Sequence, residues 1–491
     1  MRIFKNLFVL VSVLVLVGAV AINPAVAAKI KNVIVLIPDG CSQSTLTLAR
    51  WYKGEKLTVD DLYAGVVKHE MANSVITGSA AAGTAFAAGY KTTARFLGIG
   101  PREDDVLSTY IWPEDPATFS YKPIVTVLEA AKLDGKATGL ISTSRFTHAT
   151  PAAYACHSND RGNEHTDISE HMVYNEVDLI FGGGERNLVP KSMGGKRTDE
   201  EDLRDVLADR GYTIARTKGE MDVLTSLPTF GMFAWSHMDA EIDRAYQNLE
   251  EPSLSEMTTK AIELLSQNKK GFFLMVEGSQ VDWAGHNNDP VYMATDFIEF
   301  DKAVEVALDF AKQDGKTLIL AFPDHNTGGM DIGNRAYNSG SAYTSLTVET
   351  LLDPIKGMDV TAGYVADTLC FGAYTCDFTD QQLIDAVQTY WNMAITEADA
   401  QEIRDMMNGD AGSLSYALAR IISKNYTAIG WTSHGHNAED VPLWAYGPGA
   451  PQTGLYDNTE LAGMVADALD LNMKRAQRKL FVNLDDVFGE A

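Results

Sequence analysis

Short apolar runs alternate with amphipathic stretches along most of this chain. The runs are rich in Val, Ile and Leu and lack the regular in-and-out alternation of a half-exposed strand. They are VIVLI (33–37), ATGLIS (137–142), VDLIFGG (177–183), FFLMV (272–276), TLILAF (317–322) and VPLWAYG (441–447). Such runs are typical of parallel strands that are buried on both faces. They predict the strands of one central sheet.

Helical patterns fill the spaces between these runs, at residues 126–136, 199–210, 254–270 and 294–316. This alternation predicts an α/β fold, a three-layer sandwich in which helices flank a largely parallel central sheet. The rhythm breaks between about residues 334 and 429, where polar turns, two cysteines and helical segments such as TEADAQEIRDMMNG follow one another. We expect this stretch to be a large insertion that covers a site or forms an oligomer interface, and not a second catalytic domain.

The N-terminus has the order of a secretory signal peptide. The basic MRIFKN precedes the apolar LFVLVSVLVLVGAVAI, and the small residues of NPAVAAK follow. We therefore expect a signal peptide at residues 1–27, cleaved near Ala27 or Ala28, and a catalytic domain from residue 28 to 491 in the periplasm or the medium. A retained transmembrane anchor is the alternative, but the apolar stretch is short and a small-residue site follows it.

The balance of charges excludes some partners. The chain has 40 Lys and Arg against 66 Asp and Glu, a net charge of −26 at pH 7. A surface of this sign repels nucleic acid, and bound divalent cations would offset part of the charge. Of the four cysteines, Cys370 and Cys376 are close enough to close a short loop after export, whereas Cys41 and Cys156 are expected to be buried free thiols.

Acidic residues and histidines stand where three of the apolar runs end. They are Asp39 after VIVLIP, Glu277, Asp282 and His286 after FFLMV, and Asp324 and His325 after TLILAFP. The carboxyl ends of parallel strands meet at one edge of a sheet, and one helical turn would place Asp282 and His286 on the same face. One catalytic zinc needs about three protein ligands, so this set fits two or three metal ions better. A two-metal site can hold the attacking and the leaving oxygen of a phosphoryl transfer.

Ser79 begins an alanine-rich run of high helix propensity, TGSAAAGTAFAAGYKTT. The N–H groups and the positive dipole end at a helix N-terminus favour a phosphate beside such a serine. The alternative is an ordinary N-cap serine, which this segment alone favours.

Together these motifs resemble the alkaline phosphatase family. The residues that carry the resemblance are IPDG (37–40), TGSAAAGTA (77–85), THATPAAYACHSNDR (147–161), VEGSQVDWAGH (276–286), FPDHNTGG (322–329) and SHGHNAEDVPLWAYGPG (433–449). They occur in the family's order and span most of the chain.

The resemblance implies an enzyme with two Zn²⁺ and one Mg²⁺ that hydrolyses small phosphate monoesters, usually as a homodimer. It implies that Ser79 is the nucleophile that becomes a phosphoserine and that Arg161 grips two phosphate oxygens. The implied ligands are Asp39, Asp324 and His325 for the first zinc, Asp282, His286 and His436 for the second, and Asp39, Thr150 and Glu277 for magnesium.

A few positions depart from the commonest family pattern. Gly78 stands where many relatives have an Asp that orients the arginine, so we expect a looser grip on phosphate. His434 is an alternative to His436 as a zinc ligand, although the frame set by EDVPLWAYGPG favours His436. His148 and Trp283 are expected to surround the magnesium position and the outer zinc without ligating a metal directly.

Two other classes of function remain as alternatives. One is another hydrolase of the same metalloenzyme superfamily: a phosphodiesterase, an arylsulfatase or a cofactor-independent phosphoglycerate mutase. A sulfatase would need a C/S-x-P-x-R segment, and none surrounds Ser79. The other is a secreted metal-binding protein with a degenerate site, against which the complete set from Asp39 to His436 argues. The sequence therefore predicts an exported, metal-dependent phosphate monoester hydrolase.

Overall fold

The computed structural model describes residues 29–107, 119–334, 342–370 and 376–481. The expected signal peptide at residues 1–27 lies outside the described residues. Within the described ranges, no helix has both the length and the apolar character that a membrane crossing requires.

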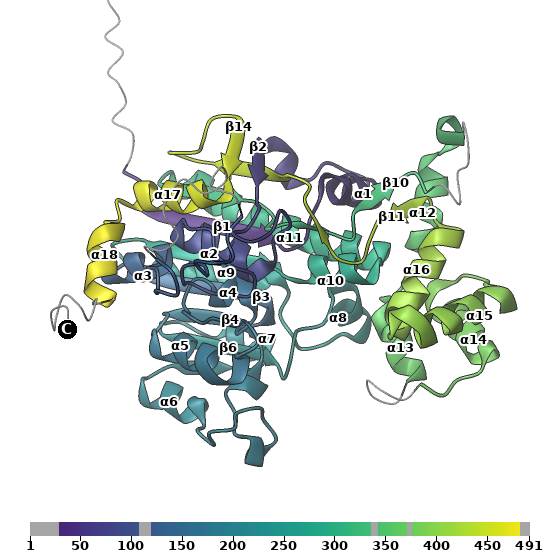
Figure 1. The fold of residues 1–491 in the computed structure, drawn as a ribbon, viewed down its shortest axis with the longest axis horizontal. Helices are drawn as coiled ribbons and strands as arrows, with labels where there is room; N and C mark the ends of the chain where they lie inside the picture. The colour runs from purple at the N-terminus through teal and green to yellow at the C-terminus, as the bar shows by residue number, and fades with distance from the viewer. Residues whose placement is uncertain (1–28, 108–118, 335–341, 371–375, 482–491) are drawn as a thin grey trace, which may run out of the picture.

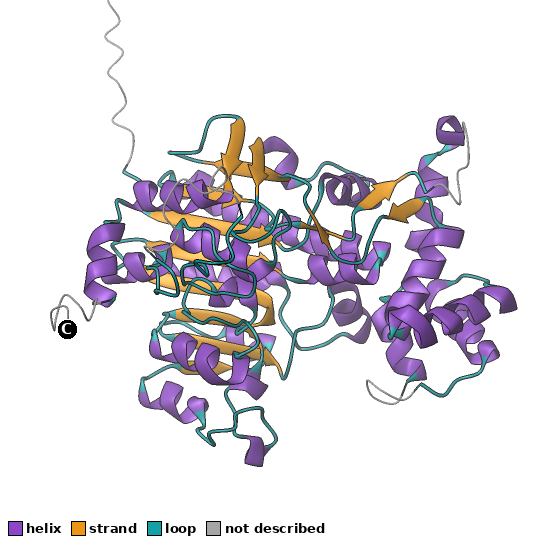
Figure 2. Ribbon diagram, viewed as in Figure 1, coloured by secondary structure: helices purple, strands orange, loops and turns teal. Residues whose placement is uncertain are grey.

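A ten-stranded sheet runs through the middle of the molecule (Figure 1, Figure 2). From one edge to the other its strands are β14 (Gly454–Asp457), β2 (Tyr63–Lys68), β13 (Val441–Tyr446), β8 (Thr317–Ala321), β1 (Asn32–Pro38), β7 (Phe272–Gly278), β3 (Ala137–Arg145), β4 (Leu179–Gly183), β6 (Thr229–Ala234) and β5 (Thr213–Ala215). Neighbouring strands are parallel except at β13, which is antiparallel to both β2 and β8. The largely parallel sheet is the one that the sequence predicts.

Helices cover both faces of this sheet because both faces are apolar. In β1, Val33 and Val35 belong to one hydrophobic core and Ile34 and Leu36 to the other. The first core is closed by α2 (Ser79–Ala88), α3 (Val127–Leu133), α4 (Ala149–Ala152), α5 (Ser169–Tyr174), α6 (Leu203–Asp209) and α17 (Asn458–Leu469); the second by α1 (Gln43–Lys53), α7 (Lys218–Asp222), α8 (Glu241–Gln247), α9 (Leu254–Leu265), α10 (Gln280–Asn287) and α11 (Pro290–Asp314). The predicted three-layer α/β architecture is confirmed.

All six predicted apolar runs form strands of this sheet, but one runs in the other direction. The run at 441–447 becomes β13, which is antiparallel and not parallel as expected. The chain reaches β13 from β12 (His436–Asn437), which already lies near the carboxyl edge, so β13 has to run back from there. Burial on both faces gives the same apolar run in either direction, which is why the pattern could not show it.

A helical unit lies between two short strands, in the stretch of the chain where we expect an insertion. β10 (Met330–Ile332) and β11 (Ile429–Trp431) pair as antiparallel strands at its base. Beyond them lie α12 (Val348–Lys356), α13 (Ala362–Leu369), α14 (Asp380–Trp391), α15 (Glu397–Met406) and α16 (Leu414–Tyr426), which gather at the right of Figure 1. A disulfide joins Cys370 to Cys376, and Cys41 and Cys156 are buried free thiols.

The last helix, α18 (Met473–Leu480), packs against α3 outside the two main cores. The predicted helical stretches appear as α3, α6, α9 and α11, and all four begin at side-chain caps. Asp202 accepts a hydrogen bond from the N–H of Arg204 at the start of α6, and Ser253 accepts one from Glu256 at the start of α9. Because of these caps, α6 begins inside the predicted stretch 199–210, and α9 begins at the first residue of the predicted stretch 254–270.

Candidate active site

Three neighbouring strands deliver acidic residues to one edge of the sheet. Asp39 directly follows β1, Glu277 stands near the end of β7, and Asp324 follows β8, with β1 between the other two. Gly40 makes this arrangement possible, because its φ is +74° and an added Cβ would lie 2.6 Å from the Cα of Asp282. The chain can therefore leave β1 and pass tightly against α10.

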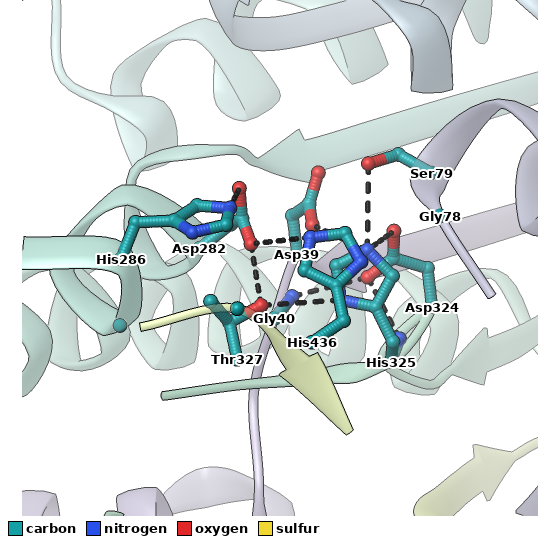
Figure 3. Close-up of polar contacts among 12 residues, drawn as sticks. Asp39, Gly40, Gly78, Ser79, Asp282, His286, Asp324, His325, Thr327 and His436 are labelled. Atoms are coloured by element: carbon teal, nitrogen blue, oxygen red, sulfur yellow. Dashed lines mark hydrogen bonds and ion pairs between the residues drawn. The ribbon is translucent and has the colours of Figure 1, made fainter. Parts of the chain in front are cut away.

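Helix α10 and the small sheet of β9 (Asn326–Thr327) and β12 supply the other side of the cluster (Figure 3). The Nε2 of His286 lies 3.3 Å from Oδ2 of Asp282, and the Nε2 of His436 lies 3.6 Å from Oδ1 of the same carboxylate. His436 stacks on His325 with ring centroids 3.5 Å apart. Residues separated by more than 100 positions therefore share one site.

In this cluster, three sets of side chains have ligand atoms close enough to hold a cation. They are Asp39, Asp324 and His325; Asp282, His325 and His436; and Asp39, His148 and Glu277. The first set is the one that the sequence resemblance implies for one zinc. In the second, His325 takes the place expected for His286, whose Nε2 nevertheless contacts Asp282. In the third, His148 itself joins the acids of the magnesium position.

Several buried oxygens of this cluster have no hydrogen-bond donor. Both carboxylate oxygens of Asp39, one oxygen of Glu277 and the hydroxyl of Thr150 are buried without a partner among the described residues. A buried carboxylate without a partner costs several kcal/mol, on the order of the desolvation penalty of an ion. Divalent cations would satisfy these oxygens, so the residues present fit a metal centre.

The acids of the cluster oppose one another's ionisation. Burial raises the pKa of Asp39 well above its usual range, and the charges of Asp324, Asp282 and Glu277 raise it further. Burial also raises the pKa of Glu277, to about 7. In the protein without cations these two groups therefore hold protons that a metal would displace.

The histidines divide into two electrostatic classes. Burial acts against the charged forms of Asp282 and His286, but their mutual hydrogen bond and attraction prevail, lowering the pKa of Asp282 and raising that of His286 to about 9. Burial and the neighbouring His325 lower the pKa of His436 to about 4. His436 is therefore a neutral imidazole near neutral pH, the form that ligates metals.

Ser79 faces this cluster from the N-terminus of α2. Its hydroxyl is buried and lies 3.4 Å from the Nε2 of His325 (Figure 3). The N-cap of α2 is Gly78, so Ser79 is the first residue of the helix and not the capping serine of the alternative interpretation. The helix dipole and the free N–H groups of the first turn lie beside it.

A histidine side chain holds Arg161. Its Nη2 donates to the Nε2 of His148 at 2.8 Å. Burial and the charge of Arg161 lower the pKa of His148 well below its usual value, so the imidazole is a neutral acceptor. The ring of Trp283 packs edge-on against His148 with centroids 5.7 Å apart.

The structure adds residues that the sequence interpretation missed. The hydroxyl of Thr327 donates to Oδ1 of Asp282 at 2.5 Å, and Thr327 pairs across the small sheet with His436. Its spacing two residues after His325 is a signal, since alternate residues of a strand share a face. His237, whose ring lies 4.2 Å from Trp283, gave no such signal, because it follows β6 in a loop without a motif.

The side chain of His434 lies outside the cluster of acids and histidines. Its side chain is exposed and packs against Tyr416, while its backbone carbonyl accepts a hydrogen bond of 2.6 Å from Nδ1 of His286. His436, in contrast, donates from Nδ1 to the carbonyl of Thr77 at 2.9 Å and turns Nε2 toward Asp282. Of the two histidines, His436 is the one that lies in the cluster.

Comparisons with known proteins agree over nearly the whole chain. A model of the alkaline phosphatase family matches residues 30–471. Alkaline phosphatase 3 of Bacillus subtilis (strain 168) is 35% identical over 463 residues, 91% of this chain and 90% of that protein. The solved alkaline phosphatase of Thermus thermophilus superposes with a TM-score of 0.77 at 27% identity, covering 92% of this chain and 95% of that one. A TAB5 alkaline phosphatase mutant with Mg bound in its M3 site has a TM-score of 0.62 at 25% identity, covering 90% and 99% of the two chains. This chain therefore belongs to the alkaline phosphatase family, whose metal-dependent enzymes hydrolyse phosphate monoesters.

Proposed function

We propose that the enzyme hydrolyses phosphate monoesters by double displacement, with Ser79 as the nucleophile. The observation that carries this proposal is the position of the Ser79 hydroxyl, buried at a helix N-terminus and 3.4 Å from His325 within a cation-binding cluster. A serine hydroxyl is a weak nucleophile unless a base or a metal activates it. Here the neighbouring His325 forms a cation-binding set with Asp39 and Asp324, so a metal is the activating group that we propose.

We also propose that the centre holds two Zn²⁺ and one Mg²⁺. Asp39, Asp324 and His325 would bind the zinc beside Ser79; Asp282, His286 and His436 the outer zinc; and Asp39, Thr150 and Glu277 the magnesium. The unpartnered oxygens of Asp39, Glu277 and Thr150 support the cations, and the TAB5 mutant with Mg in its M3 site supports the third ion. When bound, such ions act as Lewis acids that favour deprotonated oxygen nucleophiles and leaving groups.

The chain's own groups then complete two steps. Ser79 Oγ loses its proton and attacks phosphorus, the ester oxygen leaves as an alcohol once protonated, and a water later attacks phosphoserine to release inorganic phosphate and restore the hydroxyl. Arg161 offers a planar pair of N–H groups to two phosphate oxygens. The first-turn N–H groups of α2 face the same phosphate.

Export and assembly belong to the same proposal. The basic, apolar and small-residue order of residues 1–27 supports secretion to the periplasm or the medium. The helical unit α12–α16 borders the catalytic core along a groove of about 550 Å³ lined by residues of α8, α10 and α13. We propose that this insertion serves as a crown over the site or as the interface of a homodimer.

Replacing the nucleophile tests the mechanism. Ser79→Ala should abolish both turnover and the acid-stable phosphoenzyme that labelled phosphate monoester leaves on the protein, with metal content unchanged. Ser266→Ala, at the exposed end of α9, is the matched control and should keep both. Unchanged turnover in Ser79→Ala would exclude the serine mechanism. Comparing a monoester and a diester with the same leaving group separates this function from a phosphodiesterase.

A further inference from the structure

The carboxyl edge of the sheet continues beyond the metal cluster with cationic residues. Next to β7 come β3, β4 and β6 in that order. β3 ends at Arg145, β4 is followed by a short turn of helix (Glu185–Asn187) that contains Arg186, and β6 is followed by His237. Because parallel strands present their carboxyl ends to one edge, these three residues extend the edge that carries Asp39 and Glu277.

A chain of contacts connects these residues with the phosphate-binding arginine. The guanidinium of Arg145 contacts the ring of His237. That ring lies 4.2 Å from Trp283 and 5.6 Å from His148, measured between centroids. His148 accepts the hydrogen bond of 2.8 Å from Arg161. Arg145 and Arg161 are thus separated by two packed imidazoles only.

Arg186 has no acceptor in the described parts of the chain. Its side chain is half-buried, and its Nε is buried without a hydrogen-bond partner. The two carboxylates of this region are already engaged: Glu164 binds Arg145 through two hydrogen bonds of 2.6 and 2.5 Å, and Glu185 binds Arg204 and Arg216. Burying a guanidinium N–H without an acceptor is costly, and an anionic ligand would remove that cost.

The local charge has the sign that such a ligand needs. Burial, followed by the charges of Arg145, Arg186 and Arg161, lowers the pKa of His237 to about 3, so the imidazole is neutral. Burial and the charge of Arg145 also lower the pKa of Arg186. Three guanidiniums, those of Arg145, Arg186 and Arg161, thus act on the one imidazole of His237.

We propose that Arg186, together with Arg145, forms a second anion site beside the catalytic phosphate site, which binds a second phosphate group on the substrate. The proposal rests on the function proposed above. The guanidinium fork of the unpaired Arg186 suits two phosphate oxygens, and the Arg145 guanidinium, held by Glu164, lies in the same region. Substrates that bear two phosphates on one small alcohol would be preferred over the corresponding monophosphates. Glu164 fixes the orientation of the Arg145 guanidinium, which contributes to the site in that orientation.

A matched pair of substrates tests this site. The probes are the bisphosphate of propane-1,3-diol and the monophosphate of the same diol, and the measured quantity is the ratio of their kcat/KM values. Arg186→Gln should lower this ratio about tenfold, since a charge-assisted hydrogen bond is worth roughly 1.5–3 kcal/mol. Arg186→Lys should restore part of it. Arg216→Gln removes a guanidinium of the same region that is paired with Glu185, and should leave the ratio unchanged.

The outcomes separate this inference from the proposed function. A wild-type enzyme that hydrolyses neither probe would contradict the proposed function, whereas hydrolysis of both with the same ratio in wild type and Arg186→Gln overturns the second anion site. If Arg186→Gln does not fold, the wild type alone decides. Its ratio should fall several-fold between low and high ionic strength, because the extra phosphate is recognised by partly exposed charges. A ratio that does not respond to salt overturns the site.

Discussion

Backbone carbonyls determine which nitrogen two histidines of the cluster, His286 and His436, turn toward Asp282. Nδ1 of His286 donates to the carbonyl of His434, and Nδ1 of His436 donates to the carbonyl of Thr77. Both rings therefore present Nε2 to Asp282. Fixing the donor nitrogen in this way sets the tautomer and the orientation of a ligand, and such contacts typically change metal affinity about 10- to 100-fold.

Thr327 should matter for metal affinity although it is not a ligand. Its hydroxyl donates to Asp282 at 2.5 Å in a buried position. Thr327→Val keeps the shape and removes the donor, so we expect the affinity for the outer zinc to fall about 10- to 100-fold. Thr327→Ser keeps the hydroxyl and should retain most of it. Zinc titration of the metal-free protein measures both, and equal affinities in the two variants would contradict this role.

The two histidines of the SHGH segment should behave differently. His436→Ala removes an imidazole that lies 3.6 Å from Asp282, and should lose one zinc per chain together with most of the activity. His434→Ala removes an exposed side chain and leaves the carbonyl that receives His286, so metal content should stay close to that of the wild type. Metal analysis of both variants checks this. Loss of zinc in His434→Ala alone would reverse the assignment.

At the scale of secondary structure, the sequence predicted the features that repeat or that stand beside a motif. The runs that end in Asp39, Glu277 and Asp324 became β1, β7 and β8, three adjacent strands. A buried strand can be predicted because its length and its burial both determine the run of apolar residues in the sequence. Bringing His436 to Asp282 depends on the pairing of β9 with β12, which are two residues long each and leave no periodicity to detect.

The pattern of residues could not predict the direction of a strand or the position of loop residues that belong to no motif. β13 has the composition of its parallel neighbours, and only the route of the chain makes it antiparallel. β2 and β6 are strands without a predicted run, since Gly65 and Gly231 interrupt their apolar character. His237 and Arg186 reach the site through loops, where position depends on the tertiary fold and not on local spacing.

Helix α2, whose first residue is Ser79, packs closely against the α4 segment at Gly83. An added Cβ at Gly83 would lie 2.8 Å from the Cβ of Ala153. Gly83→Ala should therefore push the two helices apart, destabilising the fold by about 1–3 kcal/mol and lowering kcat as Ser79 shifts from the cluster.

A matched glycine separates packing from helix propensity. Gly463 lies in α17, and an added Cβ there meets nothing within 4 Å. Gly463→Ala should stabilise the protein by up to about 1 kcal/mol and leave kcat unchanged. Denaturant unfolding and steady-state kinetics measure both effects. A Gly83→Ala variant that is stabilised like Gly463→Ala would show that the two helices can separate freely.

For the whole molecule, the acids of the centre connect metal content with stability. The chain carries a net charge of −26, and Asp39, Glu277 and Asp324 are completely buried. Without cations, burial and the neighbouring negative charges oppose the ionised form of Asp39 and Glu277, a cost that surface carboxylates, screened by solvent, do not have. We therefore expect chelation to lower the unfolding temperature, and Zn²⁺ with Mg²⁺ to restore it.

The pH dependence of the metal-free protein should show which carboxylates are responsible. Burial raises the pKa of Glu277 in the folded state to about 7, above its ordinary value of 4.5, so the folded state binds more protons than the unfolded state between these values. Stability is then lost as pH rises toward 7, by about 2 kcal/mol between pH 5.5 and 7.5 for this group. Glu277→Gln should remove that part of the decline, whereas Glu263→Gln, on an exposed position of α9, should not. Denaturant unfolding at the two pH values measures the difference. Parallel declines in wild type and Glu277→Gln would mean that Glu277 ionises freely, and the stabilisation by metals would then have to come from other ligands.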